Sequence, residues 1–427
     1  MNQALIEQAA EAKAASRILM TADTNLKNHA LSTIADALMR RKDEWLAANA
    51  LDMEAAQEAG ISKAMLDRLK LTESRIEGIV DGVRQVVKLP DPIGVVDKMS
   101  TRPNGMIIGR RRVPLGVIAM IFEARPNVTV DAAVLCLKSG NVCILRGGKE
   151  AIRSNRVAAA IMQDALEAAG LPKGCISLVQ DTSHETAEEL MHLNEYVDVL
   201  IPRGGAGLIR NVAKNASIPV IRTGEGVCHV YIDKEANLEM GARILENGKC
   251  SRPSVCNAVE CVLIHESRAA EFLPIAAKLL AGHQVELRCD ERALALIQKE
   301  AGETASYHGC SVIPAVPEDW DTEYNDYILA VHIVDSYEEA VDFISAHGTQ
   351  HSECIITDNY FTAQRFLNEI DAAAVYVNAS TRFTDGGEFG LGAEIGISTQ
   401  KLHARGPMGL EELTSCKYVI YGDGQIR

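Results

Sequence analysis

A cysteine at position 256 stands where a thiol can be presented to a substrate. Gly248 and Pro253 interrupt the segment before it, so Cys256 is expected on a loop rather than inside a regular element. The apolar run Val259–Ile264 follows and is typical of a buried strand. A loop thiol anchored by a rigid strand can attack an electrophile, whereas a thiol inside the strand is packed away from it.

A structural role is the alternative for any cysteine, because cysteine is among the most frequently buried residue types. Lys249 and Arg252 distinguish Cys256, since nearby cations favour the thiolate, which is the nucleophilic form. Cys250 falls at a predicted helix end and is the weaker candidate. Of the eleven cysteines, six lie in apolar, periodic segments and fit a structural role: Cys136, Cys143, Cys175, Cys261, Cys289 and Cys354.

Two cations, Arg146 and Lys149, follow the predicted strand Val142–Leu145, with two glycines between them. Parallel sheets bind ligands at the carboxyl ends of their strands, so these cations can hold a ribose or a nucleotide phosphate; a solvated basic turn is the alternative. Gly204 and Gly205 precede a predicted helix and can offer backbone N–H groups to a phosphate. An ordinary tight turn is the alternative there, because no Gly-x-Gly-x-x-Gly follows the first strand.

Another predicted strand end carries Arg125 and Asn127. Asn127 either caps the next helix or donates a hydrogen bond to a developing oxyanion, and Arg125 can pair with a carboxylate or a phosphate. Near the other end of the chain, the segment Thr381–Gly392 is too rich in glycine and charge for a core. Loops of this kind often line sites, and its Arg382 is expected, with Arg125, to bind the substrate.

The elements that must position these residues alternate regularly along the chain. Gln3–Leu89 is alanine-rich and helix-periodic, and a hairpin is predicted near Arg102–Arg112. Beyond it strands and helices alternate, and the rhythm restarts at His229, which predicts two α/β domains with helices on both faces of mostly parallel sheets. Ser154 is expected to cap a helix that runs to Gly170. The predicted strands are Val113–Phe122, Val142–Leu145, Ile176–Val179, Val197–Ile201, Pro219–Ile221, Val259–Ile264, Ile328–Val334, Cys354–Thr357 and Ala374–Val377.

Composition narrows the class of protein. A chain of 427 residues with 47% hydrophobic residues supplies two domains and a substantial core. A net charge of −15 argues against a nucleic-acid or an anionic-membrane partner. The odd cysteine count and the absence of Cys-x-x-Cys argue against a disulfide framework and a metal site. Without a signal-peptide pattern or a run of eighteen apolar residues, the sequence predicts a soluble, cytoplasmic protein.

Long motifs spread over nearly the whole chain resemble the gamma-glutamyl phosphate reductases, a family within the aldehyde dehydrogenase superfamily. The resemblance implies an aldehyde-dehydrogenase-like α/β fold, with two doubly wound parallel-sheet domains plus a small oligomerisation element. Cys256 falls where that superfamily keeps its nucleophile. The motifs that carry the resemblance are Val113–Ile118, Glu123–Asp131, Leu137–Asn141, Leu145–Glu150, Arg252–Ala258, Arg382–Gly396 and Lys401–Leu410.

The resemblance implies NADPH-dependent reduction of L-glutamyl 5-phosphate to L-glutamate 5-semialdehyde and phosphate, the second step of proline biosynthesis. Cys256 would expel phosphate and form a thioester, which hydride then reduces to the aldehyde. Asn127, Arg125 or backbone N–H groups near Cys256 would hold the oxyanion.

The resemblance also assigns the cofactor contacts. Arg146 matches a strand-end lysine that binds the adenosine ribose in the superfamily, and Lys149 replaces an acidic residue often found there, which suits the 2′-phosphate of NADP. Gly204 and Gly205 match a pyrophosphate-binding turn, and Glu323 matches a glutamate that binds the nicotinamide ribose.

A related aldehyde dehydrogenase that oxidises a small aldehyde is the main alternative, and a catalytically silent binding subunit is a further one. Hydrolytic members carry a Glu-Leu-Gly-Gly motif whose glutamate activates water. Here Arg222 stands near that position, with Glu225 close by in sequence. The missing motif argues against the hydrolytic version, and the intact Cys256 argues against a silent subunit.

The expected domain boundaries follow from the same resemblance. Residues 1–97 and 113–228 would bind NADPH, residues 229–405 would form the catalytic domain, and residues 98–112 and 406–427 would form an oligomerisation hairpin and tail. The expected assembly is a homodimer or a homotetramer. No kinase-like region is present in these 427 residues, so the preceding phosphorylation would require glutamate 5-kinase as a separate chain.

Overall fold

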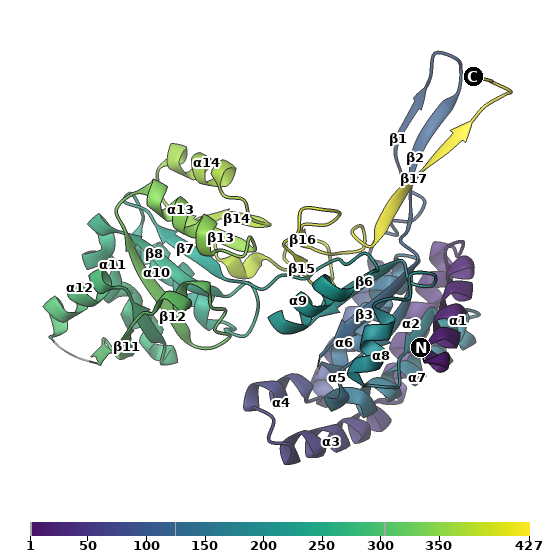
Figure 1. The fold of residues 1–427 in the computed structure, drawn as a ribbon, viewed down its shortest axis with the longest axis horizontal. Coiled ribbons are helices and arrows are strands. Elements are labelled where there is room, and N and C mark those ends of the chain that lie inside the picture. Colours follow the sequence, from purple (N-terminus) through teal and green to yellow (C-terminus); the bar gives the residue numbers. More distant parts are fainter. Residues whose placement is uncertain (1, 124, 303–304) are drawn as a thin grey trace. The chain divides into compact units, whose positions relative to one another are not determined.

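The computed structural model of the chain describes residues 2–123, 125–302 and 305–427. They gather into two compact α/β units (Figure 1). Unit 1 is made of three stretches: Met1–Thr223, Gly390–Gly396 and Pro407–Arg427. Unit 2 is made of two: Gly224–Phe389 and Ile397–Gly406.

Unit 1 begins with helices whose amphipathic faces build part of its core. In α5, the buried residues Ile76, Val80, Val83 and Val86 recur every three or four positions, which places them on one side of the helix. Most of these helices start at a residue whose side chain accepts a backbone hydrogen bond: Asn2, Asp23, Ser62 and Thr72. The helices are α1 (Gln3–Leu19), α2 (Thr24–Arg40), α3 (Lys42–Glu58), α4 (Lys63–Leu69) and α5 (Glu73–Lys88).

A parallel sheet of order β5-β4-β3-β6 forms the centre of unit 1. The chain builds β3, β4 and β5 outward in one direction and then returns to place β6 on the other side of β3. This reversal is the switch point at which such sheets bind ligands beyond the carboxyl ends of their strands. The elements are β3 (Val117–Phe122), α6 (Pro126–Lys138), β4 (Val142–Arg146), η1 (Lys149–Ala151), α7 (Ile152–Ala168), β5 (Ile176–Leu178), α8 (His184–Leu190), β6 (Val199–Arg203) and α9 (Ala206–Asn215).

The predicted strand Val113–Phe122 is in fact two strands, because Gly116 breaks it. Gly116 has a φ of +127°, and a Cβ there would lie 2.2 Å from Oδ2 of Asp198. Asp198 cannot withdraw, since its carboxylate accepts the backbone N–H of Val117 at 2.8 Å and pairs with Lys13 at 2.8 Å. The close approach of this carboxylate to the backbone therefore requires glycine.

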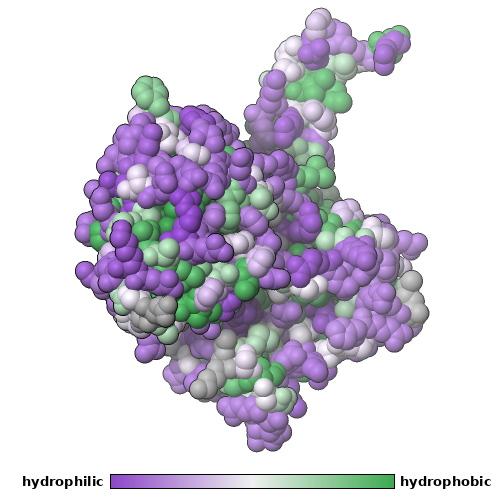
Figure 2. Space-filling model, turned by 60° about the vertical axis from the view of Figure 1, so that its left-hand side comes forward, coloured by the Kyte–Doolittle hydropathy of each residue, from purple (hydrophilic) through white to green (hydrophobic). Residues whose placement is uncertain are grey.

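The residues before this break belong to a separate three-stranded antiparallel sheet of unit 1, which carries both the predicted hairpin and the predicted tail. Strands β1 (Val96–Thr101) and β2 (Ile107–Pro114) form the hairpin, and β17 (Thr414–Tyr421) pairs with β2 (Figure 1). Apolar side chains stand exposed among hydrophilic ones on this sheet (Figure 2), including Met99, Tyr418 and Ile420.

Unit 2 contains an eight-stranded sheet of order β10-β11-β9-β12-β8-β7-β13-β14, in which only the β10–β11 pair of the described strands is antiparallel. Its elements are β7 (Cys228–Ile232), α10 (Leu238–Cys250), β8 (Val259–His265), α11 (Glu266–Leu280), β9 (Glu286–Cys289), α12 (Glu291–Ala301), β10 (Ser306–Tyr307), β11 (Cys310–Pro314), β12 (Ile328–Val334), α13 (Tyr337–His347), β13 (Ser352–Ile356), α14 (Tyr360–Glu369), β14 (Ala374–Val377) and η5 (Thr381–Phe383). Two further short strands are β15 (Ile397–Ser398) and β16 (Gly406–Pro407).

Alternate residues along the central strands of unit 2 enter two separate apolar clusters. Val262 and Ile264 of β8 pack with Phe272 of α11, whereas Leu263 packs with Phe366 of α14. Successive side chains of a strand point to opposite faces, so α10, α11 and α12 cover one face and α13 and α14 cover the other. The prediction of doubly wound, mostly parallel α/β sheets is confirmed.

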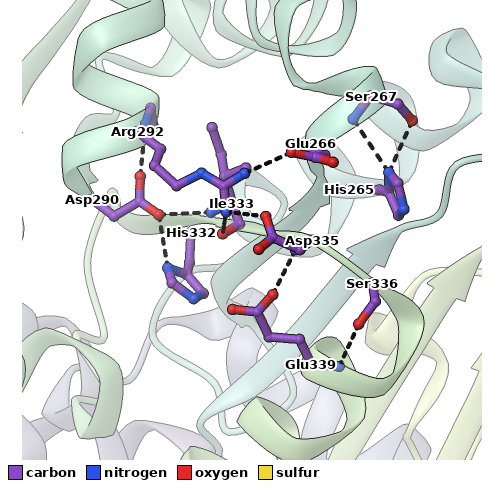
Figure 3. Close-up of polar contacts among 11 residues, drawn as sticks. His265, Glu266, Ser267, Asp290, Arg292, His332, Ile333, Asp335, Ser336 and Glu339 are labelled. Atoms are coloured by element: carbon purple, nitrogen blue, oxygen red, sulfur yellow. Dashed lines mark hydrogen bonds and ion pairs between the residues drawn. The ribbon is translucent and has the colours of Figure 1, made fainter.

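A charged network closes the carboxyl edge of the unit 2 sheet (Figure 3). Asp290 caps α12, and its Oδ2 lies 2.8 Å from Nδ1 of His332. Arg292 forms ion pairs with Glu266 at 3.0 Å and Asp335 at 2.6 Å. Burial acts to raise the pKa of Asp290, but hydrogen bonds from His332 and two backbone amides outweigh burial and lower it. This edge is therefore filled by the protein's own charges.

Two local predictions are wrong. Ser154 does not cap a helix, because α7 begins at Ile152; its N–H and hydroxyl instead donate to Oδ2 of Asp52 at 2.8 and 2.7 Å. Pro219–Ile221 forms no strand beyond an isolated bridge at Val220. Local hydrophobic periodicity predicts neither the bonds of Ser154 to the buried Asp52 carboxylate nor the single bridge of Val220 to Leu200.

The division into units differs from the predicted boundaries at residues 224–228 and 390–396. Gly224 donates to Ile397 O at 2.7 Å, which ties the first segment to unit 2. Ile395 donates to Met408 O at 3.0 Å, which ties the second to unit 1 rather than to the predicted range 229–405. Within the part of the chain that the structure describes, no helix is both long and apolar enough to cross a membrane.

Replacing Gly116 by alanine should lower the free energy of unfolding by about 2–3 kcal/mol, because the new Cβ meets Asp198 in a backbone conformation that favours glycine. Gly78→Ala is the matched control, since Gly78 lies in α5 and has no atom within 4 Å of the added methyl. Helix propensity predicts that this control is neutral or slightly stabilising. Urea unfolding of both variants measures the difference, and equal stabilities would contradict this account of the β2–β3 break.

Candidate active site

Cys256 lies on a turn between α10 and β8, as the sequence predicts. The helix ends at Cys250, the turn is closed by a hydrogen bond from Ala258 N to Val255 O at 3.0 Å, and β8 begins at Val259. The strand and the helix therefore hold the turn from both sides and leave the thiol on a connecting segment.

Solvent access separates Cys256 from the other thiols. Nine of the eleven cysteines, all described by the structure, are buried, and only Cys256 and Cys416 are partly exposed. Burial raises the pKa of Cys250 to about 12, which keeps that thiol protonated and unreactive. The six cysteines expected to be structural are all buried, which agrees with the prediction. Cys416 lies in β17 and donates to Asp97 at 3.5 Å.

The backbone of Cys256 rests on the segment that leads into β7. A Cβ on Gly226 would lie 1.4 Å from the carbonyl oxygen of Cys256, so the two main chains touch and no side chain fits between them. The Cys228 thiol donates to the same carbonyl at 3.3 Å. The N–H of Gly226 donates to Oε1 of Glu323 at 3.1 Å. Glu323, predicted to bind the cofactor, thus contacts Gly226, the residue against which the Cys256 loop packs.

The cation expected from Lys249 is not directed to Cys256. Lys249 is fully buried, and its ammonium bonds Oε2 of Glu260 at 2.5 Å. Burial raises the pKa of Glu260 although Lys249 acts to lower it. Sequence spacing could not reveal this pairing, because Glu260 lies on the next strand.

Arg382 supplies a cation at the nucleophile loop. Its Nε donates to the hydroxyl of Ser251 at 3.1 Å, and its Nη1 donates to Oδ1 of Asn257. Burial lowers the pKa of Arg382 and the neighbouring charge of Arg252 lowers it further, whereas Asp385 and Cys256 act to raise it. Because Nη1 bonds Asn257, the residue next to Cys256, the guanidinium lies at the loop that carries the thiol, and a cation there favours the thiolate.

Asn257 fixes the loop immediately after Cys256. Its Nδ2 donates to Thr384 O at 2.9 Å, and its own carbonyl accepts the hydroxyl of Thr381 at 2.7 Å. These bonds join the turn to η5, a short 3₁₀ helix. It lies in the stretch Thr381–Gly392, which the sequence predicts to be a loop. Sequence reasoning missed Asn257, although its place next to Cys256 was the available signal.

In unit 1, a cavity of about 420 Å³ opens at the carboxyl ends of β3 and β4. Arg146 and Lys149 line it, with residues of α8 and α9. Arg146 donates through Nη2 to Thr182 O at 2.6 Å and Ser183 O at 3.0 Å, while its buried Nε has no partner among the described residues. Burial lowers the pKa of Arg146. Lys149 is exposed at the rim, so both predicted cations face one cavity.

Gly204 and Gly205 join β6 to α9, and Gly205 occupies the N-cap position. The N–H of Gly205 donates to Oε2 of Glu123 at 2.9 Å, and a Cβ on Gly204 would lie 2.7 Å from that carboxylate. An acidic side chain therefore occupies the turn that the sequence assigned to pyrophosphate. Glu123 was not predicted here, because it lies at the end of a different strand.

Asn127 is the second residue of α6, after Pro126 at the first position and Arg125 at the N-cap. Its predicted capping role is wrong, because proline begins the helix and the amide lies inside the first turn. The Nδ2 of Asn127 donates to Oδ2 of Asp131 at 2.9 Å. Burial raises the pKa of Asp131 to about 6, although Asn127 and Arg203 act to lower it.

The sequence is similar to known proteins along its whole length. A model of the aldehyde dehydrogenase family matches residues 2–305. A gamma-glutamyl phosphate reductase from Halothermothrix orenii is 58% identical over 427 residues, which covers 100% of this chain and 99% of the relative. One from Enterococcus faecalis is 57% identical over 98% of this chain and 97% of the relative. The chain belongs to the gamma-glutamyl phosphate reductase family.

Solved structures agree with this family. The crystal structure of a gamma-glutamyl phosphate reductase from Thermotoga maritima matches with a TM-score of 0.94 and 44% identity, and the match covers 99% of each chain. An acetylating aldehyde dehydrogenase from Geobacillus thermoglucosidasius shares the fold at a TM-score of 0.71 and 20% identity, covering 100% of this chain and 98% of that one. The family resemblance expected from the motifs is confirmed.

The predicted site residues of this reductase-family chain fall into two groups. Arg125, Asn127, Arg146, Lys149, Gly204 and Gly205 belong to unit 1, and Cys256, Glu323 and Arg382 belong to unit 2. Within unit 2, Gly226 and Asn257 tie the three predicted residues to one loop. In the sequence, Gly226 belongs only to a weak phosphate-binding pattern with Gly224, but no helix follows it in the structure.

Gly226→Ala should displace the nucleophile loop, because the added Cβ would overlap the Cys256 carbonyl. The rate of alkylation of Cys256 by iodoacetamide, followed by peptide mass spectrometry, is expected to change by at least about tenfold. Gly207→Ala is the control, since Gly207 has no atom within 4 Å of the added methyl. If both variants react like the unmodified protein, Gly226 does not support the loop.

Proposed function

We propose that this chain catalyses the NADPH-dependent reduction of L-glutamyl 5-phosphate to L-glutamate 5-semialdehyde and phosphate, the second step of proline biosynthesis. The observation that carries the proposal is a partly exposed Cys256 beside the Arg382 guanidinium, in a chain of the gamma-glutamyl phosphate reductase family. The substrate's acyl phosphate is an electrophile that a thiolate attacks readily.

In the first step, the Cys256 sulfur bonds to the acyl carbon and the bond from that carbon to the phosphate oxygen breaks. Phosphate leaves with the electron pair and takes up the proton that the thiol gave up, and a thioester remains on Cys256. Arg382 favours the thiolate, and the bonds of Asn257 and the contact with Gly226 hold the sulfur in place.

The residues of the unit 1 cavity suit a dinucleotide. The buried Nε of Arg146, which has no partner among the described residues, is a hydrogen-bond donor at a strand end that lines this cavity. Arg146 would bind the adenosine ribose and Lys149 the 2′-phosphate. Gly204 and Gly205 would bind the pyrophosphate in place of the Glu123 carboxylate, which here accepts the N–H of Gly205. In unit 2, Glu323 would bind the nicotinamide ribose. When bound, NADPH would supply the hydride.

After reduction, the thiohemiacetal on Cys256 collapses, the carbon–sulfur bond breaks, and the semialdehyde leaves as the thiol is restored. Asn127 would donate to the oxyanion of the thiohemiacetal and of the tetrahedral adduct that forms when Cys256 attacks the acyl phosphate. One N–H of its amide is held by Asp131, and the other remains to donate. Arg125 is the alternative donor, and it or Arg382 binds the anionic substrate.

Several further features complete the proposal. The three-stranded sheet of β1, β2 and β17 would serve a homodimer or homotetramer, because it exposes apolar side chains and unpaired strand edges. Unit 1 apart from its three-stranded sheet would form the cofactor domain, and unit 2 the catalytic domain. The enzyme would act in the cytoplasm and would receive its substrate from glutamate 5-kinase.

Cys256→Ala should abolish NADPH oxidation with glutamyl phosphate, a loss of about 10⁴-fold or more, because the thioester forms on this thiol. The reverse assay, NADP reduction with semialdehyde and phosphate, should fail equally. Cys416→Ala, the other partly exposed thiol, is the control and should retain its rate. Oxidation of the aldehyde without phosphate would favour the hydrolytic alternative, and a Cys256→Ala variant at full rate would contradict the mechanism.

Lys149→Ala should weaken NADPH binding about tenfold, or ~1.4 kcal/mol, while NADH binding changes little, because only NADPH offers a 2′-phosphate to the ammonium. Fluorescence titration measures both affinities without turnover. Lys173→Ala serves as the control, since Lys173 pairs with Asp164 and Glu167 and does not line the cavity. Equal losses for NADPH and NADH would remove Lys149 from the 2′-phosphate.

A further inference from the structure

Two guanidinium groups stand at the nucleophile loop, and the reaction steps above use only one of them. Arg252 lies four residues before Cys256 and is exposed. Within the described ranges, Arg252 makes neither a hydrogen bond nor an ion pair to any residue. Arg382 reaches the same loop from η5. The charge of Arg252 lowers the pKa of Arg382, so the two groups lie close enough to repel each other.

Arg382 is oriented by its two bonds to the loop. Nε is held by Ser251 at 3.1 Å and Nη1 by Asn257, the residues next to Arg252 and Cys256 respectively. Nη2 has no partner in the described part of the chain. One edge of the guanidinium therefore fixes it in place, and the remaining nitrogen is available to a ligand.

No carboxylate neutralises this pair among the described residues. Asp385 is the acidic side chain that acts to raise the pKa of Arg382. Its Oδ1 accepts the backbone N–H groups of Gly387 at 2.8 Å and Glu388 at 3.3 Å, so it stabilises its own turn. In contrast, many other arginines of the chain pair with acids, among them Arg288 and Arg292. Two neighbouring like charges without a counter-ion favour the binding of an anion.

We propose that Arg252 and Arg382 form the subsite for the phosphoryl group of the substrate and for the phosphate that leaves. This inference rests on the proposed function. It assigns the two arginines to the phosphoryl end of the substrate and not to its amino-acid end. Guanidinium groups match the oxygens of a phosphate and stabilise negative charge that grows on the leaving oxygen as the bond to the acyl carbon breaks. The pair thereby also distinguishes a phosphorylated substrate from a free carboxylic acid.

The first test uses the reverse reaction, with semialdehyde, NADP and inorganic phosphate. Arg252→Ala should raise the KM for phosphate at least about tenfold and leave the KM for semialdehyde within about twofold. Arg252→Lys should recover part of the phosphate affinity, because it restores the charge without the planar fork. Arg243→Ala, an exposed arginine on α10, is the matched control and should change neither constant.

The second test needs neither cofactor nor turnover. Inorganic phosphate should protect Cys256 from alkylation by iodoacetamide in the unmodified protein, and this protection should require at least about tenfold more phosphate in Arg252→Ala. Iodoacetate, an anion, should react with Cys256 faster relative to iodoacetamide in the unmodified protein than in the variant. Melting temperatures of the variants report whether they fold.

The outcomes separate this inference from the proposed function. If the unmodified protein catalyses no phosphate-dependent reaction, the proposed function is wrong. If that reaction occurs but the KM for phosphate and the protection are unchanged in a folded Arg252→Ala variant, the phosphoryl subsite is wrong. An equal rise in the KM for semialdehyde would place Arg252 at the amino-acid end of the substrate and would likewise overturn the assignment.

Discussion

The contact between Gly226 and the carbonyl of Cys256 is the constraint on which the candidate catalytic loop depends. It brings two main chains so close that even a methyl group would not fit, and the bonds of Cys228 and Glu323 reinforce the same point. A nucleophile on a loop is accessible but poorly defined in position. A backbone contact of this kind fixes the loop without burying the thiol, and the side chain of Asn257 fixes its other end.

The two units use opposite edges of their sheets. In unit 1 the cavity lies at the carboxyl ends of β3 and β4, next to the point where the strand order reverses. In unit 2 the corresponding edge is filled by the network around Asp290, and Cys256 precedes the amino end of β8 instead. Within unit 2, the buried cation Lys249 pairs with Glu260, whereas neither Arg252 nor Arg382 forms an ion pair with a carboxylate among the described residues.

Much of this arrangement could be predicted from sequence because it depends on local signals. An apolar run gave the strand that follows Cys256, and residue type with spacing singled out Cys256, Arg146 and Lys149. The failures involve partners distant in the chain. Lys249 was expected to favour the Cys256 thiolate but pairs with Glu260. Of the two alternatives for Asn127, capping is wrong, because proline begins the helix. The contacts of Glu123 with Gly205 and of Asp198 with Gly116 join residues far apart in the chain, so local sequence patterns do not predict them.

The sheet that joins β2 to β17 also governs when unit 1 can be completed. Pro114 pairs with Thr414, 300 positions later in the chain. At a synthesis rate of roughly 5–20 residues per second, about 15–60 s separate these partners on the ribosome. During that interval the edge of β2 is open to pairing with other chains. Arg110, Arg111 and Arg112 stand on this strand, and charged side chains on an unpaired edge discourage such pairing. On this principle, the arginine run would discourage such pairing until β17 has been made.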